Sequence, residues 1–255
     1  MTSIGVYFDG FNVYYGGRKK FGREAAGWRW YSPRAISKKT LEYALQQPFL
    51  KQNEEVFHLW SDGSIDRIVF CTARVSPTRS QQAANDQNVY LSALQDGNHI
   101  DHLELGKYVS RIKYAPLATK NSDGHPQVVT PTWPVMVQDS QNEHISDATF
   151  LASYLHSEEK GSDVNFATHL LKDVFEQRIS AAILISNDTD LKLPISVARS
   201  KVPVAVVNPS ESRVHNDLLE GHDPSRDWYM TMPKSCFCES QMPPQVGKWR
   251  RPQGW

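Results

Sequence analysis

Apolar runs typical of β-strands alternate with helix-like segments along most of this 255-residue chain. Strand-like runs lie at 3–9, 66–75, 100–109, 181–187 and 202–208. Apolar residues at helical spacing predict helices over 35–47, 80–95, 163–177 and 190–200. Parallel strands need crossover connections, which the helices provide. The alternation therefore predicts an α/β fold, an α/β/α sandwich around a central, mostly parallel sheet with right-handed crossovers.

Two of the predicted helices have features that locate them more closely. The apolar face of helix 163–177 is predicted to consist of Val164, Ala167, Leu171 and Val174, at steps of three and four. Pro194 favours either a first-turn position or an early break in the segment 190–200.

Two segments depart from the alternation. Residues 110–146 contain four prolines and the turn signal Asn-Ser-Asp-Gly at 121–124, between stretches rich in β-forming residues. They predict a β-hairpin or arm inserted into the fold. Residues 231–255 contain four prolines and no periodicity. They predict an extended C-terminal strap over the surface, with Trp249 and Trp255 available to dock it.

The charge of the chain is balanced, since Lys+Arg and Asp+Glu both number 28. Composition alone therefore predicts no nucleic-acid binding. Residues 18–39 nevertheless hold eight basic residues against one acid, with Phe21, Trp28, Trp30 and Tyr31 interleaved. Such a segment fits two interpretations equally well. One is a surface whose basic groups neutralise phosphates and whose rings stack on bases, and the other is a solvated, partly packed face.

Cysteine usage and hydropathy favour a soluble protein of the cytoplasm. Cys71, Cys236 and Cys238 are too few for a disulfide framework, and no second pair accompanies Cys236 and Cys238 at zinc spacing. No apolar run approaches the about 20 residues of a membrane span. The amino terminus lacks the pattern of a secretory signal, so we expect no membrane association and a cytoplasmic location.

Acidic residues follow the two most apolar strands. Asp9 ends the first strand, and Asp188 and Asp190 follow the strand 181–187. If these strands are neighbours, their ends lie about 5 Å apart and the carboxylates repel one another. A divalent cation that prefers oxygen ligands, Mg²⁺ or Mn²⁺, would relieve this repulsion.

Asp163, at the start of the helix 163–177, is a fourth candidate ligand. Its alternative role is that of an N-cap, for which aspartate is a preferred residue. Turn and cap chemistry also explains Asp9 and the pair Asp188 and Asp190 individually. It does not explain why both apolar strands end in acid.

Several other chemistries lack their motifs. The sequence contains no GxGxxG after a strand, no GxxxxGK[ST], no HExxH and no GxSxG. Phe11 stands two positions after Asp9, where an aspartyl-phosphate phosphatase would have an acid. Nine histidines show no metal-site spacing, and His169 is interpreted as packed or solvated.

Three blocks of the sequence together resemble the NYN domain family of PIN-like nucleases. They are VYFDGFNVYY, EEKGSDVNFATHLLKDVF and AAILISNDTDLKLPISVARSKVPVAVVNP, in matching order and spacing. The resemblance, to a bacterial branch of the family, continues through DRIVFCTARVSP, DQNVYLSAL, GKYVSRIKYAPLAT, TWPVMVQD and RPQGW. It implies a Rossmann-like, PIN-like α/β/α domain over 1–230 with a parallel sheet of about five strands. Insertions would lie at about 18–60 and 110–146, and the strap at 231–255.

The resemblance also implies an activity, a metal-dependent endoribonuclease that hydrolyses RNA phosphodiester bonds and leaves 5′-phosphate and 3′-hydroxyl ends. The residues that match the family's catalytic motif are Asp9, Asn12, Asp163, Asp188 and Asp190. The four aspartates would hold one or two Mg²⁺ or Mn²⁺ ions, and Asn12 would supply an amide oxygen or orient a phosphate. Ser186 matches the small hydroxyl residue before the late acidic pair, and Leu191 stands where the family commonly has Phe.

Several residues are candidates for contacts with single-stranded or structured RNA, and simple solvation is the alternative for the basic ones. They are Ser186, Lys160, Arg74, Lys107, Arg111, Arg18, Lys19, Lys20 and Arg23.

A regulatory protein partner, as for a toxin or defence nuclease, stays open. Two other functions also stay open, since a fold does not fix a function. One is a non-catalytic module that binds RNA or a partner. The other is a hydrolase of small phosphate esters, which an enclosed pocket would favour over an open groove. An acidic cluster with a purely structural ion is a further alternative.

Overall fold

The computed structural model describes residues 2–77, 80–129, 139–143, 145 and 150–255. Two compact units make up the chain. The first comprises Met1–Tyr108 and Glu159–Trp255, and the second comprises Val109–Glu158. In the described ranges, no helix is both long enough and apolar enough to cross a membrane.

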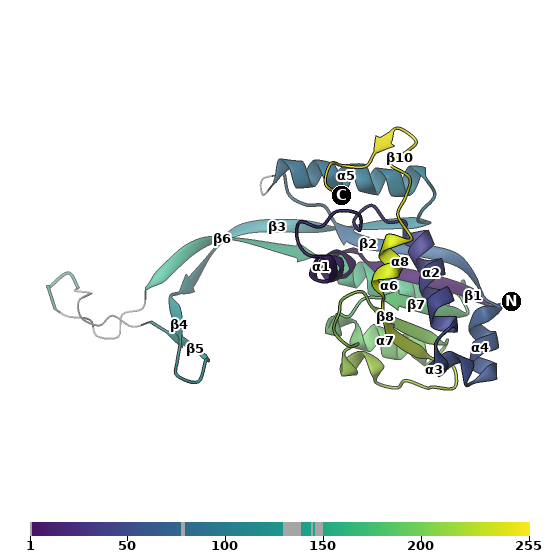
Figure 1. The fold of residues 1–255 in the computed structure, drawn as a ribbon. Helices are drawn as coiled ribbons and strands as arrows, with labels where there is room; N and C mark the ends of the chain where they lie inside the picture. The colour runs from purple at the N-terminus through teal and green to yellow at the C-terminus, as the bar shows by residue number, and fades with distance from the viewer. Residues whose placement is uncertain (1, 78–79, 130–138, 144, 146–149) are drawn as a thin grey trace. The chain divides into compact units, whose positions relative to one another are not determined.

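A seven-stranded sheet in the order β6-β3-β2-β1-β7-β8-β9 is the centre of the fold (Figure 1). Its strands are β1 (Ser3–Asp9), β2 (Ser64–Ala73), β3 (His102–Pro116), β6 (Leu151–Lys160), β7 (Ala181–Ile185), β8 (Val204–Asn208) and β9 (Trp228–Thr231). The pairs β1–β2, β1–β7, β2–β3, β7–β8 and β8–β9 are all parallel. The predicted α/β class with a mostly parallel central sheet is therefore confirmed, although the sheet has more strands than the about five expected.

The helices of the described residues are α1 (Gly10–Phe21), α2 (Pro33–Leu45), α3 (Pro48–Lys51), α4 (Glu54–Ser61), α5 (Gln81–Asp96), α6 (Ser162–Phe175), α7 (Lys192–Arg199) and α8 (Lys234–Cys238). Four of them, α2, α5, α6 and α7, match the predicted segments, whereas α1, α3, α4 and α8 were not predicted. Two 3-10 turns, η1 (Thr189–Leu191) and η2 (Asn216–Leu219), complete the set. Pro194 lies in the first turn of α7, where a missing backbone N–H costs no hydrogen bond.

The sheet separates two apolar cores. In β1, Val6 and Phe8 face one core together with Trp30 and other residues of the segments before β2. Tyr7 faces the other core, where it meets Phe166 of α6. Successive side chains of a strand point to opposite faces, so a strand apolar at every position needs cover on both sides. This produces the predicted layered arrangement.

The face that α6 turns to the sheet matches the predicted one only at Leu171 and Val174. Phe166, Leu170 and Val174 are buried, whereas Val164 is 68% exposed. Gly161 is the N-cap residue before α6 and has a positive φ of 99°, which glycine adopts without strain, so the capping alternative for Asp163 is wrong. Asp163 lies in the first turn instead.

The aromatic residues of the basic segment 18–39 belong to the core. Trp28 and Trp30 are fully buried and Tyr31 is nearly so. Arg29 donates hydrogen bonds to the backbone oxygens of Ala25 and Gly254. The segment is therefore partly packed, and Trp28, Trp30 and Tyr31 expose little of their rings to solvent.

The inserted segment contains the predicted hairpin. Within the second unit, β4 (Ala118–Lys120) and β5 (Pro126–Val128) pair antiparallel around the turn at 121–124. The side chain of Asn121 closes that turn by accepting the backbone N–H groups of Asp123 and His125. The strand β6 was not predicted, and residues 130–138, 144 and 146 of the predicted arm lie outside the described residues.

The C-terminal segment is more structured than an extended strap. It forms α8 and a small antiparallel pair, β10 (Gln245–Val246) and β11 (Trp249–Arg250). Met232, Phe237 and Met242 anchor it because each is buried in the core. The two tryptophans dock as expected. Trp249 Nε1 donates to Asp96 at 2.6 Å, and the Trp255 ring lies 5.6 Å from that of Tyr90.

Candidate functional site

The strand order reverses between β1 and β7, because the strands that follow each of them along the chain extend the sheet toward opposite edges. From β1 the sheet proceeds to β2 and β3, whereas from β7 it proceeds to β8 and β9. Phe8 pairs with Ile185, so the two strands end side by side. Ligands of open α/β sheets bind in the crevice at the carboxyl ends of strands where the order reverses. Asp9 and Ser186, one residue further on, lie at this point.

Asp9 is fixed by two hydrogen bonds within the crevice. Its Oδ1 accepts the backbone N–H of Asn12 at 2.9 Å and thereby caps α1, and its Oδ2 accepts the Ser186 hydroxyl at 2.9 Å. The side chain is buried, and this burial raises the pKa of Asp9 to about 7. The two hydrogen bonds lower that pKa, while the charges of Asp163 and Asp188 raise it further.

Asp163 and Asp188 complete a cluster of three carboxylates from three elements. One carboxylate oxygen of each lies within 4.8 Å of the others. Burial raises the pKa of Asp163 to about 6, and the neighbouring carboxylates of Asp188, Glu159 and Asp190 add to the shift. Such a cluster holds an oxygen-preferring divalent cation well, because the cation removes the repulsion between the ionised groups.

Two expected site residues position the cluster rather than joining it. The Asn12 side-chain oxygen accepts the backbone N–H of Asn187 at 3.0 Å, which leaves it poorly placed as a ligand. Ser186 is only 2% exposed; it donates to Asp9 and accepts the backbone N–H of Asp188 at 3.1 Å. Its predicted contact with RNA is therefore wrong.

Asp190 stands outside the trio. It is exposed, and its backbone N–H donates to Asp188 Oδ1, the oxygen that caps the turn η1. Its negative charge acts on Asp163 from a distance. The structure thus brings together Asp9, Asp163 and Asp188 but not the fourth predicted ligand.

A pocket of about 480 Å³ opens over the three aspartates. Lys19 and Glu159 also line it, and Lys19 is exposed. Glu159 was not predicted as a site residue; its Oε1 accepts the backbone N–H of Ser162 and so holds the start of α6. Its position in the acidic run before Gly161 was the available signal.

A second pocket of about 470 Å³ adjoins the first, because Phe11, Tyr15 and Tyr108 line both. The further aromatic residues that line it are Tyr14, Trp28, Tyr31, Phe70, Tyr90 and Trp255. They come from segments far apart in the sequence, so no local pattern reveals the pocket. Arg18, an expected RNA contact, lies on its wall.

The remaining basic candidates of the first unit divide into buried and exposed groups. Lys20 is buried, and its ammonium donates to the backbone oxygens of Pro209, Ser210 and Met232. Burial lowers the pKa of Lys20 to about 8. Its expected contact with RNA is wrong, because these carbonyls use its donors. Arg74 donates to Asn88, and Arg23 pairs with Glu24. Lys107 and Lys160 are exposed.

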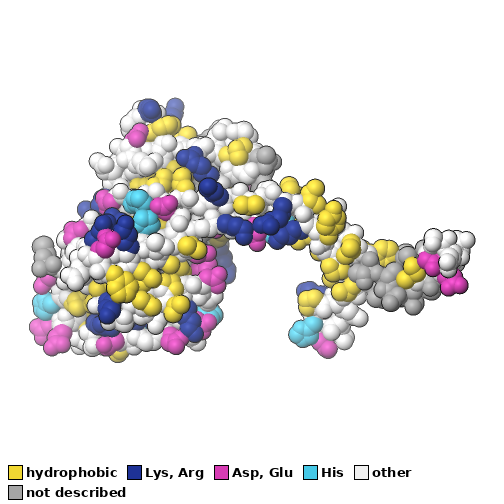
Figure 2. Space-filling model, turned by 180° about the vertical axis from the view of Figure 1, so that it is seen from behind, with side chains coloured by type: hydrophobic (Ala, Val, Ile, Leu, Met, Phe, Trp, Pro, Cys, Tyr) yellow, Lys and Arg dark blue, Asp and Glu magenta, His cyan; other side chains and the backbone are white. Residues whose placement is uncertain are grey.

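Arg111 belongs to the second unit. Its guanidinium lies 3.6 Å from Glu158, and Lys113 lies 3.9 Å from the same carboxylate. Figure 2 shows Lys and Arg side chains gathered where the neighbouring strands β3 and β6 carry these residues. Arg111 therefore has an acidic partner within its own unit.

Comparisons with known proteins identify no family. No family model matches the chain, and no curated protein matches it. Among solved structures, a protein of unknown function from Vibrio parahaemolyticus is similar, with a TM-score of 0.40 and 12% identity. The match covers 91% of this chain and 94% of that one. A similarity of this size assigns no activity.

Proposed function

We propose that this chain is a metal-dependent endoribonuclease with a PIN-like arrangement of its acidic residues. The observation that carries the proposal is the convergence of Asp9, Asp163 and Asp188 at the strand ends where the sheet order reverses. The resemblance of the sequence blocks around these residues to NYN domains supports the same reading.

The donor set fits Mg²⁺ or Mn²⁺, since all three side chains offer carboxylate oxygen. Burial, with the neighbouring carboxylates, raises the pKa values of Asp9 and Asp163, and a cation would relieve the repulsion between the ionised groups. These three side chains would hold the ion. When bound, such an ion supplies an activated water and stabilises negative charge on the phosphate.

Other residues keep this arrangement rigid. Ser186 connects Asp9 to the backbone of Asp188, and Asn12 fixes the loop after β7 through Asn187. Asn187 in turn accepts the backbone N–H of His215 at 2.8 Å. Lys19, on the pocket wall, would offset the charge of a bound phosphate.

The adjoining aromatic pocket favours a polynucleotide over a small phosphate ester. Tyr14 and Tyr15 are 38% and 56% exposed, so their rings are accessible beside the acidic cluster. Single-stranded RNA offers unpaired bases that stack on such rings. A scissile phosphate over the aspartates and a neighbouring base in the second pocket would occupy both cavities together.

The test is cleavage of an end-labelled single-stranded RNA and the matched DNA in Mn²⁺, Mg²⁺ or EDTA. We expect metal-dependent cutting of RNA with 5′-phosphate ends, reduced about 100-fold or more in Asp188→Asn because a ligand is lost. Asp62→Asn, on an exposed side chain at the end of α4, is the matched control and should cut normally. Cutting that persists in Asp188→Asn would place the active site elsewhere. A protein that binds Mn²⁺ but cuts neither polymer would contradict the proposal.

A further inference from the structure

A second cluster of metal-ligating side chains lies apart from the acidic one. Among the described residues, two groups place three such side chains within reach of one ion, and the second comprises His102, Glu104 and His169. The prediction that the histidines form no metal site rested on sequence spacing alone. The structure brings His102 and Glu104 of β3 next to His169 of α6, a meeting that spacing does not address.

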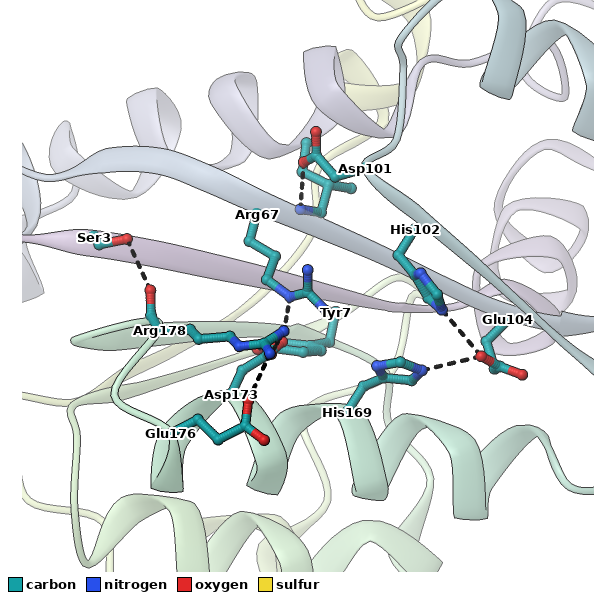
Figure 3. Close-up of polar contacts among 11 residues, drawn as sticks. Ser3, Tyr7, Arg67, Asp101, His102, Glu104, His169, Asp173, Glu176 and Arg178 are labelled. Carbon is teal, nitrogen blue, oxygen red and sulfur yellow. Dashed lines mark hydrogen bonds and ion pairs between the residues drawn. The ribbon is translucent and has the colours of Figure 1, made fainter.

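The local structure explains why these three side chains meet. His102 and Glu104 are two positions apart on β3 and so point to the same face of the sheet. His169 lies on α6, which covers that face (Figure 3). His102 Nε2 lies 3.0 Å and His169 Nε2 3.1 Å from Glu104 Oε2, and the two rings lie 4.5 Å apart.

These spacings are close to those of a zinc site. Zinc binds histidine nitrogen and carboxylate oxygen at about 2.0–2.2 Å, which places neighbouring tetrahedral ligands about 3.3 Å apart. Both measured nitrogen–oxygen separations are within a few tenths of an ångström of that value. His169 is largely buried, while His102 and Glu104 are partly exposed, so water can supply the fourth ligand.

We infer that His102, Glu104 and His169 form a binding site for a Zn²⁺ ion that joins β3 to α6. The site shares no ligand with the acidic cluster, and about 9 Å of helix separates Asp163 from His169. The donors differ as well, because imidazole suits Zn²⁺ whereas three carboxylates suit Mg²⁺ or Mn²⁺. The inference therefore does not depend on the proposed nuclease activity.

A bound Zn²⁺ would have a structural consequence for the first unit. It would fix α6 against the sheet at a point less than two turns beyond Asp163, the carboxylate that this helix contributes to the acidic cluster. The ligand set is the two histidines and one carboxylate found in many zinc sites.

The test is Zn²⁺ binding by the full chain without an affinity tag, measured in competition with a chromophoric chelator. We expect one Zn²⁺ with a Kd below about 1 µM, retained in the double variant Asp9→Asn, Asp188→Asn. His169→Gln and His102→Gln should each weaken binding about 100-fold or more. Zn²⁺ should raise the melting temperature of the wild type but not of these variants.

The matched control is His58→Gln, since His58 also lies near two carboxylates, Glu54 and Asp62, but no second histidine of the described part of the chain joins them. It should bind Zn²⁺ as the wild type does. Equal binding by wild type, His102→Gln and His169→Gln, with circular dichroism showing folded proteins, would overturn the inference. So would loss of all binding in the double aspartate variant, or a wild type that binds no Zn²⁺ at micromolar concentration.

Discussion

Replacing Asp9 with Asn should make the metal-free protein more stable at neutral and higher pH. Asp9 has a pKa of about 7 in the folded chain, against an ordinary value of 3.8. The folded state therefore binds this proton more tightly than the unfolded state, and ionisation of Asp9 opposes folding. The penalty is negligible below pH 3.8, grows as the pH rises, and reaches its full value above about pH 7.

The size of the effect follows from that difference in pKa. About three pH units correspond to about 4 kcal/mol, which is the ceiling for the stabilisation. Asparagine keeps the acceptor for the Asn12 N–H, and the Ser186 hydroxyl can rotate to accept from the new amide. We therefore expect a gain of about 2–4 kcal/mol at pH 8, or about 5–15 °C in melting temperature. At pH 4 the gain should be less than about 1 kcal/mol.

The assay is thermal melting of wild type and Asp9→Asn in EDTA from pH 4 to pH 8, with Asp62→Asn as the exposed control. Mn²⁺ at about 1,000 times its Kd should cancel or reverse the difference at pH 8, because the ion stabilises only the chain that binds it, by about 4.1 kcal/mol. The reasoning is refuted if Asp9→Asn melts at or below the wild type in EDTA at pH 8. A difference that stays constant across the pH range would refute it equally.

Two further predictions concern ions and the core. Mn²⁺ affinity should fall about tenfold between pH 7 and pH 6 and more steeply below pH 6. The reason is that protons compete first for Asp9 and then for Asp163, whose pKa values are about 7 and about 6. A calorimetric titration that finds constant affinity from pH 8 to pH 5.5 would contradict this. Asp227→Asn should lower the free energy of unfolding, measured by urea denaturation, by about 3–5 kcal/mol. Arg199 and Asp227 form a buried pair at 3.0 Å, and the change leaves the guanidinium without its counter-charge. An unchanged urea midpoint would show that the pair contributes little.

The sequence predicts the elements of this fold well where hydrophobic periodicity is strong. The strand 181–187 and the helix 80–95 correspond closely to β7 and α5, and Ser80 and Gly97 stand at the ends of α5. The face of α6 was predicted only in part, because Val164 fits a helical stripe by spacing, while tertiary packing selects Phe166 and Leu170. Spacing cannot distinguish two adjacent apolar stripes on one helix.

The candidate site shows the same division between local and long-range information. Acid at two strand ends predicted a carboxylate cluster on the condition that the strands are neighbours; β1 and β7 do pair, and Asp9 and Asp188 lie together. The roles of Ser186 and Lys20 could not be predicted, because each depends on groups far away in the chain. The meeting of His169 with β3 likewise depends on how α6 lies on the sheet.

Helix α6 resists the repulsion within the acidic cluster because a polar contact holds its far end. Asp173 is fully buried, accepts the Tyr7 hydroxyl at 2.9 Å and pairs with Arg67 and Arg178 (Figure 3). A helix fixed there has little freedom to carry Asp163 away from Asp9, so the repulsion adds to the rise in pKa that burial causes in both groups and does not widen the crevice. The carboxylates thus remain placed for a cation before it binds, and binding loses less free energy to reorganisation.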